Sequence, residues 1–279
     1  MTRASLDVGG TFTDCLVLDD SGRLSAFKAP TTPADPTLGL LDVLDKAARA
    51  VGQSLEQFVP ELESITHGTT LATNALLTGR GAKVGMLTTR GFRDQIEARR
   101  GQKNIRTSMY NLFVPPYRPL VPRSRRLPVT ERVVKDGSVA IALDETDARA
   151  AIEHLADEQV ESIAVCFLHS YANGAHESRV EELCTERFDG SVYLTTSHQV
   201  VPIWGEYERF STTVVSAYVG PIVATYLARL EERLAELGFA GSLFIVQSDG
   251  LMQSAAASRR RTVGVVNSGP AAAPISAQH

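Results

Sequence analysis

The chain has 279 residues, of which 43% are hydrophobic and 22% charged, and its net charge at neutral pH is -4. A chain of this size can bury a substantial core, and the composition is that of a globular protein. The slight acidity gives no general attraction to nucleic acid or to an anionic membrane. No run approaches the roughly 18 apolar residues of a membrane span, and no signal peptide is recognised, so we expect a cytoplasmic protein.

The first predicted elements are two strands, over residues 3–8 and 15–18, joined by the turn Gly9-Gly10. Adjacent glycines can take positive φ and bring no Cβ atoms, so their backbone N–H groups can point at phosphate oxygens. The segment therefore predicts a phosphate-binding β-hairpin. The alternative is an ordinary Gly-Gly turn with no ligand.

Four polar side chains flank this turn. Thr11 and Thr13 supply hydroxyl donors, and Asp7 and Asp14 frame the loop with carboxylates. Two carboxylates would repel a bare triphosphate, but they can hold a hydrated Mg²⁺, which takes few protein ligands. The loop therefore predicts Mg·ATP as its ligand, with Asp7 and Asp14 serving the metal directly or through water.

A third strand over 24–28 and a proline-rich turn lead to the first long helix. Asp35 is predicted as its N-cap, Pro36 as its first residue and Val51 as its end. Its apolar side chains at helical spacing are predicted to cover one face of the sheet. They are Leu38, Leu41, Leu44, Ala48 and Val51.

A second candidate site is the segment His67-Gly68-Thr69-Thr70, between a predicted strand and a predicted helix. A glycine followed by hydroxyl side chains at a helix start offers N–H groups and the positive end of the helix dipole to an anion. Asn74, one turn further on, would share a face with Thr70. The alternative is that the two threonines are simple N-caps and that His67 is structural.

Strand and helix patterns alternate along the rest of the chain, which is typical of an α/β protein. A long helical stretch over 207–237 is predicted to break at Gly220-Pro221, because proline ends one helix and can start the next. The other predicted strands are 64–67, 83–88, 162–167, 192–195, 243–247 and 263–266, and the other helices are 70–77, 144–158 and 176–188.

Residues 99–132 show no clean periodicity and are rich in proline and arginine. They predict a long ordered loop or crossover whose charges are solvated or face a subunit. The alternative is that one of these arginines binds a carboxylate-bearing substrate. Aromatic residues are sparse and no recognition motif is present, so the segment does not predict nucleic-acid binding.

The sequence favours no other catalytic chemistry. Cys15, Cys166 and Cys184 lie in or beside apolar runs without a Cys-x-x-Cys pair, which predicts buried, reduced thiols. The histidines lack metal-ligand spacing, so no metal other than Mg²⁺ is predicted. Ser248 and Ser268 lie in no Gly-x-Ser-x-Gly elbow and are not predicted as nucleophiles.

Several blocks, in a common order, resemble the hydantoinase A / 5-oxoprolinase family. Residues 7–14 also resemble the first phosphate motif of the superfamily that contains sugar kinases, actin and the heat-shock chaperones. The other blocks are residues 67–77, 88–94, 165–171, 207–209, 216–221 and 268–272. The resemblance implies an α/β, actin-like (ribonuclease H-like) ATPase domain over 1–200, with the hairpin phosphate loop, and the start of a second, core domain over 201–279.

The resemblance also implies ATP-dependent opening of a cyclic amide, such as 5-oxoproline or a hydantoin. In such enzymes ATP is thought to phosphorylate the carbonyl oxygen, which becomes a leaving group that water displaces. On this hypothesis the glycines and threonines of residues 9–13 hold the phosphates, and Asp7 and Asp14 are the catalytic carboxylates that serve Mg²⁺ and water.

One departure from the family shapes the expectation for the isolated chain. The family has a second Gly-Gly-Thr motif downstream of its Ser-Gly-Pro-Ala segment, and this sequence reaches His279 without it. We therefore expect an N-terminal fragment or subunit that binds Mg·ATP weakly or not at all on its own. The implied assembly is a homo-oligomer or a hetero-oligomer with a B-type subunit. Two alternatives stay open, a subunit of an ATP-dependent ketone carboxylase and a non-catalytic domain that needs a second chain.

Overall fold

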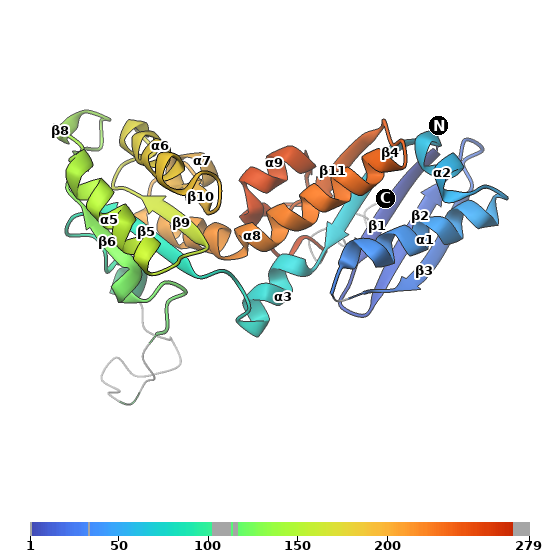
Figure 1. Cartoon of the computed structure of the whole chain (residues 1–279), viewed down its shortest axis with the longest axis horizontal. Coiled ribbons are helices and arrows are strands. Elements are labelled where there is room, and N and C mark those ends of the chain that lie inside the picture. The colour runs from blue at the N-terminus through green and yellow to red at the C-terminus, as the bar shows by residue number, and fades with distance from the viewer. Residues whose placement is uncertain (1, 33, 102–112, 114–116, 270–279) are drawn as a thin grey trace. The chain divides into compact units, whose positions relative to one another are not determined.

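The structure is a computed structural model that describes residues 2–32, 34–101, 113 and 117–269 (Figure 1). The chain forms two compact units. Unit 1 comprises residues 1–81 and 222–279, and unit 2 comprises residues 82–221. The division at residue 200 concerns domains of the family and stays a prediction.

The sheet of unit 1 has six strands. They are β1 (Thr2–Val8), β2 (Phe12–Leu18), β3 (Leu24–Pro30), β4 (Leu62–Thr69), β11 (Ser242–Val246) and β12 (Met252–Ser254). Their order is β12-β11-β4-β1-β2-β3. β1, β2 and β3 form the antiparallel hairpin and third strand that the sequence predicts, and β4 and β11 continue the sheet in parallel with β1. No strand was predicted at β12, which pairs with β11 at the edge of the sheet.

The helix α1 (Pro36–Ala50) covers one face of this sheet (Figure 1). Its N-cap is the predicted one, because the Asp35 carboxylate accepts a hydrogen bond from the Thr37 N–H at 3.1 Å. The cap and the proline at the first position fix where the helix begins.

The buried face of α1 agrees with the predicted one only in part, since Leu44 and Ala48 are fully buried as predicted. Leu38 and Val51 are 44% and 61% exposed, whereas Leu40 and Val43 are fully buried. The reason is Gly39, where an added Cβ would lie 2.9 Å from the Pro30 carbonyl oxygen. This close approach of helix to strand faces Gly39 toward the sheet, and Val43, one turn further on, shares that face.

The helix α8 (Glu206–Glu236) runs through Pro221, so the predicted break there is wrong. A proline inside a helix removes one backbone hydrogen bond, and this loss is local. Val219 and Val223 on either side are fully buried, and their burial stabilises the helical backbone through the proline. Residues up to 221 belong to unit 2, and those from 222 belong to unit 1.

α8 is also the one helix in the described ranges that is long and apolar enough, by length and composition alone, to cross a membrane. Of its apolar window, 61% is buried inside the protein. The core helix of a soluble protein passes the same test, so this is weak evidence for a membrane span.

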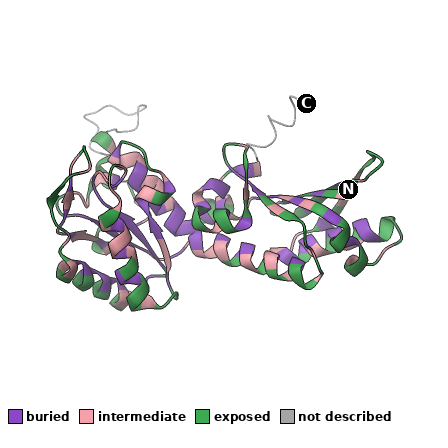
Figure 2. Ribbon diagram, turned by 90° about the horizontal axis from the view of Figure 1, so that it is seen from above, coloured by how far each residue is buried: buried purple, intermediate pink, exposed green. Residues whose placement is uncertain are grey.

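The two faces of the unit 1 sheet differ. His67 of β4 contacts Tyr226 of α8 through its ring. The register partner of His67 on β1 is Leu6, and Leu6 pairs in turn with Cys15 of β2. These residues therefore share one face of the sheet. This buried face also carries α1. The opposite face bears no helix among the described residues and exposes Leu16, Leu18 and Leu24 at its β2–β3 end. Buried and exposed residues alternate along β1 and β2, and the ribbon of Figure 2 is coloured by this burial.

Unit 2 is built on a parallel sheet of four strands in the order β10-β9-β5-β6. The strands are β5 (Val84–Thr89), β6 (Arg126–Val129), β9 (Ser162–Cys166) and β10 (Tyr193–Thr196). The helices α5 (Glu145–Asp157) and α6 (Ala175–Phe188) bury Ile152, Leu155 and Leu183 in its core. Asp144, at the start of the helix predicted over 144–158, caps α5, and its carboxylate accepts from two backbone N–H groups of the first turn.

β6 lies inside the segment predicted as a loop, and this part of the prediction is wrong. Arg126 begins the strand with 1% of its side chain exposed, and it donates to Glu97 Oε2 at 2.6 Å and to the Arg93 carbonyl at 3.0 Å. It is therefore neither solvated nor free for a substrate. Residues 102–112 and 114–116 of this segment lie outside the described residues.

The remaining elements are short. Residues 263–266 are predicted as a strand, but residues 262–265 form a 3₁₀ helix, because β12 already occupies the sheet edge beside β11. All three cysteines are buried free thiols, as predicted. The other elements are α2 (Leu55–Phe58), η1 (Val59–Glu61), α3 (Leu71–Thr78), α4 (Gln95–Ala98), η2 (Arg99–Gly101), η3 (Arg123–Arg125), β7 (Arg132–Val133), β8 (Val139–Ile141), α7 (Ser197–Val200), α9 (Ala255–Arg260) and η4 (Thr262–Val265).

Candidate functional site

A pocket of about 400 Å³ lies beside the glycine turn of unit 1. Gly9 and Gly10 line it, together with Thr69, Thr70 and Asn74 from the start of α3. Because β1 and β4 are neighbouring parallel strands, their carboxyl ends meet at the same edge of the sheet. The two candidate sites, far apart in the sequence, therefore form one pocket.

Hydrogen bonds fix the start of α3 against the end of β1. The Thr70 N–H and hydroxyl both donate to the Val8 carbonyl, at 3.2 and 3.3 Å. Asn74 Nδ2 donates to Thr70 Oγ1 at 3.2 Å, which confirms that the two side chains share a face. An added Cβ on Gly10 would lie 3.9 Å from Asn74 Nδ2, so the absent side chain leaves the space between turn and helix open.

Thr69 has the capping role that the sequence left as an alternative. Its Oγ1 accepts from the Leu71 N–H at 3.2 Å, whereas Thr70 makes no side-chain cap. The fully buried Ser268 donates to the Thr69 carbonyl at 3.2 Å. Ser268 was not predicted to act here, although it lies in one of the blocks that resemble the family.

The backbone angles of the glycine turn differ from the predicted ones. Neither Gly9 nor Gly10 has a positive φ. Gly9 is required for space instead, because an added Cβ would lie 3.0 Å from the Phe12 carbonyl oxygen. The Gly9 N–H donates to that same oxygen at 3.0 Å. The amides left to face a phosphate are therefore those of Gly10 and Thr11.

The two threonines of the turn are placed differently. Thr11 is exposed, whereas Thr13 is fully buried on the α1 face. Thr13 Oγ1 lies 3.0 Å from Thr31 Oγ1, which donates to the Gly9 carbonyl at 3.0 Å. The Thr13 hydroxyl thus supports the turn from below, and its predicted contact with phosphate would require it to leave this position. Thr31 was not predicted, because no local motif reveals it.

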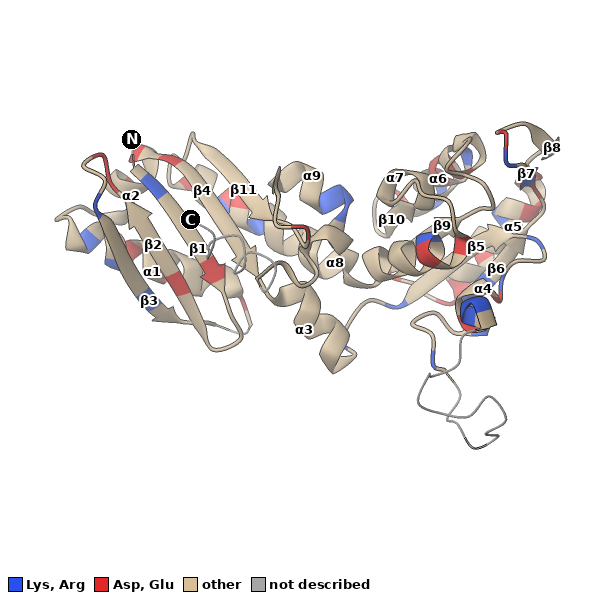
Figure 3. Ribbon diagram, turned by 180° about the vertical axis from the view of Figure 1, so that it is seen from behind, with Lys and Arg blue, Asp and Glu red and all other residues tan. Residues whose placement is uncertain are grey.

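Asp7 and Asp14 are register partners across β1 and β2. They lie on the sheet face opposite α1, where acidic segments of both strands are visible (Figure 3). The Asp14 carboxylate pairs with Lys28 at 2.9 Å. Asp7 Oδ1 occupies space beside Gly68, where an added Cβ would lie 3.2 Å away. Burial and the charge of Asp14 raise the pKa of Asp7, as expected of a carboxylate with too little positive charge nearby.

This pair of carboxylates is compatible with Mg²⁺. The described residues contain no cluster of three or more His, Cys, Asp or Glu side chains that could hold a metal on their own. Mg²⁺ does not need one, because it keeps several waters and takes one or two protein carboxylates together with substrate phosphates. Asp7 and Asp14 could serve it at the rim of the glycine turn.

His67 lies in the core and does not line the pocket. It is fully buried, and its Nε2 lies 2.9 Å from the Tyr226 hydroxyl. Burial lowers the pKa of His67 to about 4, so the ring is neutral at pH 7. The structure therefore favours the structural alternative for His67 over contact with an anion.

Arg80 lines the pocket and was not predicted. α3 ends at Gly79, which has a φ of 67°, and the Arg80 N–H donates to the Ala75 carbonyl at 3.0 Å. This left-handed turn closes the helix and places Arg80 at the end of the pocket away from the start of α3. The glycine after the predicted helix was the signal that could have revealed it.

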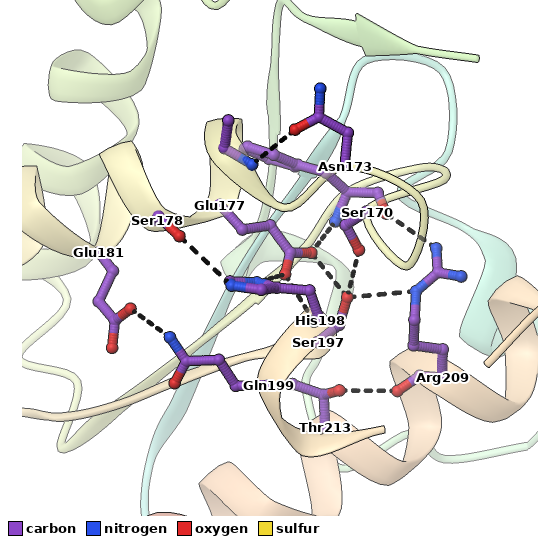
Figure 4. Close-up of polar contacts among 12 residues, drawn as sticks. Ser170, Asn173, Glu177, Ser178, Glu181, Ser197, His198, Gln199, Arg209 and Thr213 are labelled. Carbon is purple, nitrogen blue, oxygen red and sulfur yellow. Dashed lines mark hydrogen bonds and ion pairs between the residues drawn. The ribbon is translucent and has the colours of Figure 1, made fainter. Parts of the chain in front are cut away.

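Unit 2 contains a second polar cluster, at the carboxyl ends of β9 and β10 (Figure 4). Glu177 accepts hydrogen bonds from the Phe167 N–H at 2.7 Å, from the Ser197 hydroxyl at 2.6 Å, and from the backbone N–H and Nδ1 of His198. Arg209 donates to the Phe167 carbonyl at 2.8 Å. Glu177, Ser197 and Arg209 are fully buried. Their hydrogen bonds join α6, α7 and α8, so we assign this cluster a structural role and not substrate binding.

Models of protein families match both parts of the chain. Residues 3–188 match the hydantoinase/oxoprolinase N-terminal region, and residues 209–279 match hydantoinase/oxoprolinase.

Individual relatives of this chain agree with the family-model matches. Subunit alpha of caprolactamase from Pseudomonas jessenii is 38% identical over 98% of this chain and 39% of its own length. The gamma subunit of acetophenone carboxylase from Aromatoleum aromaticum is 35% identical over 88% of this chain and 35% of its own length. The 5-oxoprolinase of Saccharomyces cerevisiae is 27% identical over 89% of this chain and 22% of its own length.

Two solved structures share the fold. The ATP-dependent caprolactamase from Pseudomonas jessenii superposes with a TM-score of 0.86 over 98% of this chain and 39% of that one. The nucleotide-free acetone carboxylase superposes with a TM-score of 0.87, at 26% identity, over the whole chain and 40% of that one. These likenesses confirm the predicted α/β, actin-like fold, and this chain spans about two fifths of the caprolactamase and acetone carboxylase chains. The chain belongs to the hydantoinase/oxoprolinase family.

Proposed function

We propose that this chain supplies the first phosphate-binding loop of an ATP-dependent enzyme that opens a cyclic amide. One observation carries the proposal, namely that the glycine turn and the start of α3, far apart in the sequence, line a single pocket. The relatives named caprolactamase and 5-oxoprolinase support it. Because the chain matches only 39% of the caprolactamase subunit, the proposal assigns it this loop and not the whole active site.

The proposed reaction overcomes the low electrophilicity of an amide carbonyl. The carbonyl oxygen attacks the γ-phosphorus of ATP, a P–O bond forms, and the bond to ADP breaks. Water then adds to the carbonyl carbon, the ring C–N bond breaks, and the nitrogen takes a proton. A second water hydrolyses the resulting acyl phosphate, so the products are ADP, phosphate and an amino acid. The chain's contribution is to position and stabilise negative charge.

Each part of the loop has a proposed role. The Gly10 and Thr11 amides and the positive end of the α3 dipole face the phosphates. Thr31 holds the turn in shape from below. Asp7 and Asp14 would hold Mg²⁺, which supplies positive charge against the phosphate oxygens when bound.

A second candidate function is ATP-dependent activation of a ketone for carboxylation. The gamma subunit of acetophenone carboxylase, at 35% identity, favours it. The phosphate loop would have the same role, because a ketone enolate oxygen can accept the phosphoryl group as an amide oxygen does. Only the acceptor would differ.

The assembly is part of the proposal. Three relatives are named as subunits, of caprolactamase, acetophenone carboxylase and acetone carboxylase. We therefore place this chain in a homo-oligomer or with a B-type subunit, and in the cytoplasm, where its three buried thiols would stay reduced. A purely non-catalytic role beside a second chain is the third candidate, supported by the bare face of the unit 1 sheet.

The test is phosphate release from Mg·ATP by the 279-residue chain together with the polypeptides that co-purify with it. The acceptors are 5-oxoproline, hydantoin, caprolactam, acetone and acetophenone, each with and without bicarbonate. We expect a cyclic amide to stimulate release without bicarbonate, and Gly10→Val to abolish it while Gly22→Asn, in the distant β2–β3 turn, does not. Stimulation by ketones alone would select the carboxylase, and no stimulation by any acceptor would contradict both enzymes.

A further inference from the structure

We propose that the pocket beside the glycine turn holds the cyclic amide as well as the phosphate that activates it, and that Arg80 selects substrates bearing a carboxylate. This inference rests on the proposed function and names the substrate class of the same site.

The pocket has two chemically distinct ends. Gly10 lies beside Asn74, midway along α3, and Thr78 and Arg80 mark the other end. Asn74 and Thr78 are one helical turn apart, a rise of about 6 Å, and Arg80 lies two residues further on. A small ring with its carbonyl at the glycine turn therefore leaves room for an ionic substituent to meet the extended Arg80 side chain.

The wall between these ends suits a hydrocarbon ring and not a phosphate chain. Its apolar members are Val8, Pro36, Leu71, Ala75 and Ile222. Placing phosphate oxygens against such a surface loses their hydration without replacement. Small-molecule pockets combine an apolar lining with a few polar groups that orient the ligand, and here Thr70, Asn74 and Arg80 are those groups.

Arg80 is available for a ligand. It forms no ion pair and no side-chain hydrogen bond with any residue that the structure describes. Most of the other arginines in the described ranges do pair, such as Arg49 with Asp45 at 2.8 Å and Arg233 with Asp35 at 2.8 Å. A guanidinium binds a carboxylate through two parallel hydrogen bonds, so it would favour an anionic ring over its neutral analogue.

The competing role for Arg80 is to bind ATP phosphate. A matched pair of rings separates the two, because 5-oxoproline and 2-pyrrolidinone share the same lactam and differ only in the carboxylate. Binding is measured by ligand-detected NMR and calorimetry on the full chain, with and without Mg²⁺ and a non-hydrolysable ATP analogue. Inorganic triphosphate is the third probe.

We expect wild type to bind 5-oxoproline at least tenfold more tightly than 2-pyrrolidinone. Arg80→Gln should remove this preference and leave 2-pyrrolidinone unchanged, Arg80→Lys should retain part of it, and Arg49→Gln on α1 should have no effect. Equal binding of the two rings by wild type would overturn the inference, as would a loss confined to triphosphate in Arg80→Gln.

The outcomes also separate this inference from the proposed function. ATP-driven opening of a cyclic amide without any ring binding at this pocket would retain the function and overturn the inference. Carboxylate-dependent ring binding without ATP-driven opening by any preparation would retain the anion pocket and contradict the hydrolase.

Discussion

The Glu177 cluster of unit 2 and the glycine turn of unit 1 differ in how their polar side chains are partnered. In unit 2, Glu177 is fully buried and accepts a hydrogen bond from each neighbour that faces it (Figure 4). Glu131 is similarly buried and lies 2.8 Å from His176 Nδ1. In unit 1, the groups around the glycine turn line a pocket, and Arg80 has no protein partner in the described ranges. Satisfied buried groups indicate a structural role, and groups left without partners at a pocket indicate a ligand.

This contrast matters because sequence blocks that resemble the family occur in both units. Residues 165–171 and 207–209 resemble the family, as residues 7–14 do. The structure shows that Phe167 and Arg209 belong to the buried cluster, whereas Gly9 and Gly10 face the pocket. A residue block typical of the family can thus serve folding or ligand binding, and only its surroundings distinguish the two.

The largest change in the free energy of unfolding should come from a substitution in the buried Glu177 cluster of unit 2. Glu177→Gln removes a charge that accepts four hydrogen bonds, and we expect the free energy of unfolding to fall by about 3 kcal/mol. Glu182→Gln on the same helix is the matched control, because its side chain is 63% exposed. Urea unfolding measures both. A difference below about 0.5 kcal/mol between them would break the contrast between the units.

A smaller effect should come from the buried histidine of unit 1. Burial lowers the pKa of His67 to about 4 from its ordinary 6.5. Between these values the unfolded chain binds a proton that the folded chain does not, so stability is complete above pH 6.5 and falls as the pH is lowered toward 4. We expect a loss of roughly 2–3 kcal/mol over this window.

Urea unfolding at pH 7 and at pH 4.5 checks this loss. In His67→Gln, which cannot titrate, the loss should shrink, and in His154→Gln, an exposed position on α5, it should match wild type. An equal loss in all three proteins would assign the acid sensitivity to other groups.

The smallest effect concerns Asp7. Its pKa is raised by burial and by the charge of Asp14, so the folded chain holds this proton more tightly than the unfolded chain does. The stabilising contribution is therefore present at low pH and is lost as the pH rises through the folded pKa. At pH 7, Asp7→Asn should raise the free energy of unfolding by less than about 1 kcal/mol, since the residue is partly exposed.

The melting temperature with and without Mg²⁺ sharpens this test. Asp7→Asn should melt slightly higher than wild type without Mg²⁺ and should lose any stabilisation that Mg²⁺ gives to wild type. Asp157→Asn, exposed in unit 2, should do neither. A lower melting temperature for Asp7→Asn without Mg²⁺ would show that the carboxylate is already compensated.

The features of this protein that could be predicted from its sequence are those set by a few neighbouring residues. The hairpin, the Asp35 and Asp144 caps, the alternation of strands and helices and the buried thiols all follow from patterns within a few residues. The phosphate loop could be predicted for the same reason, because adjacent glycines between two strands are a local signal. Such patterns encode backbone preference and periodicity, which do not depend on distant parts of the chain.

The other features of the fold and of the pocket depend on packing between distant residues, and they became visible in the three-dimensional structure. Close approach at Gly39 set the buried face of α1, and burial carried α8 through Pro221. Parallel pairing of β1 with β4 brought Gly10 beside Thr70 and turned two candidate sites into one pocket. Thr13 and His67 are buried on the covered face of the sheet, and Arg80 lines the pocket because of the turn after α3. These outcomes come from contacts between residues far apart in the chain, which no local pattern contains.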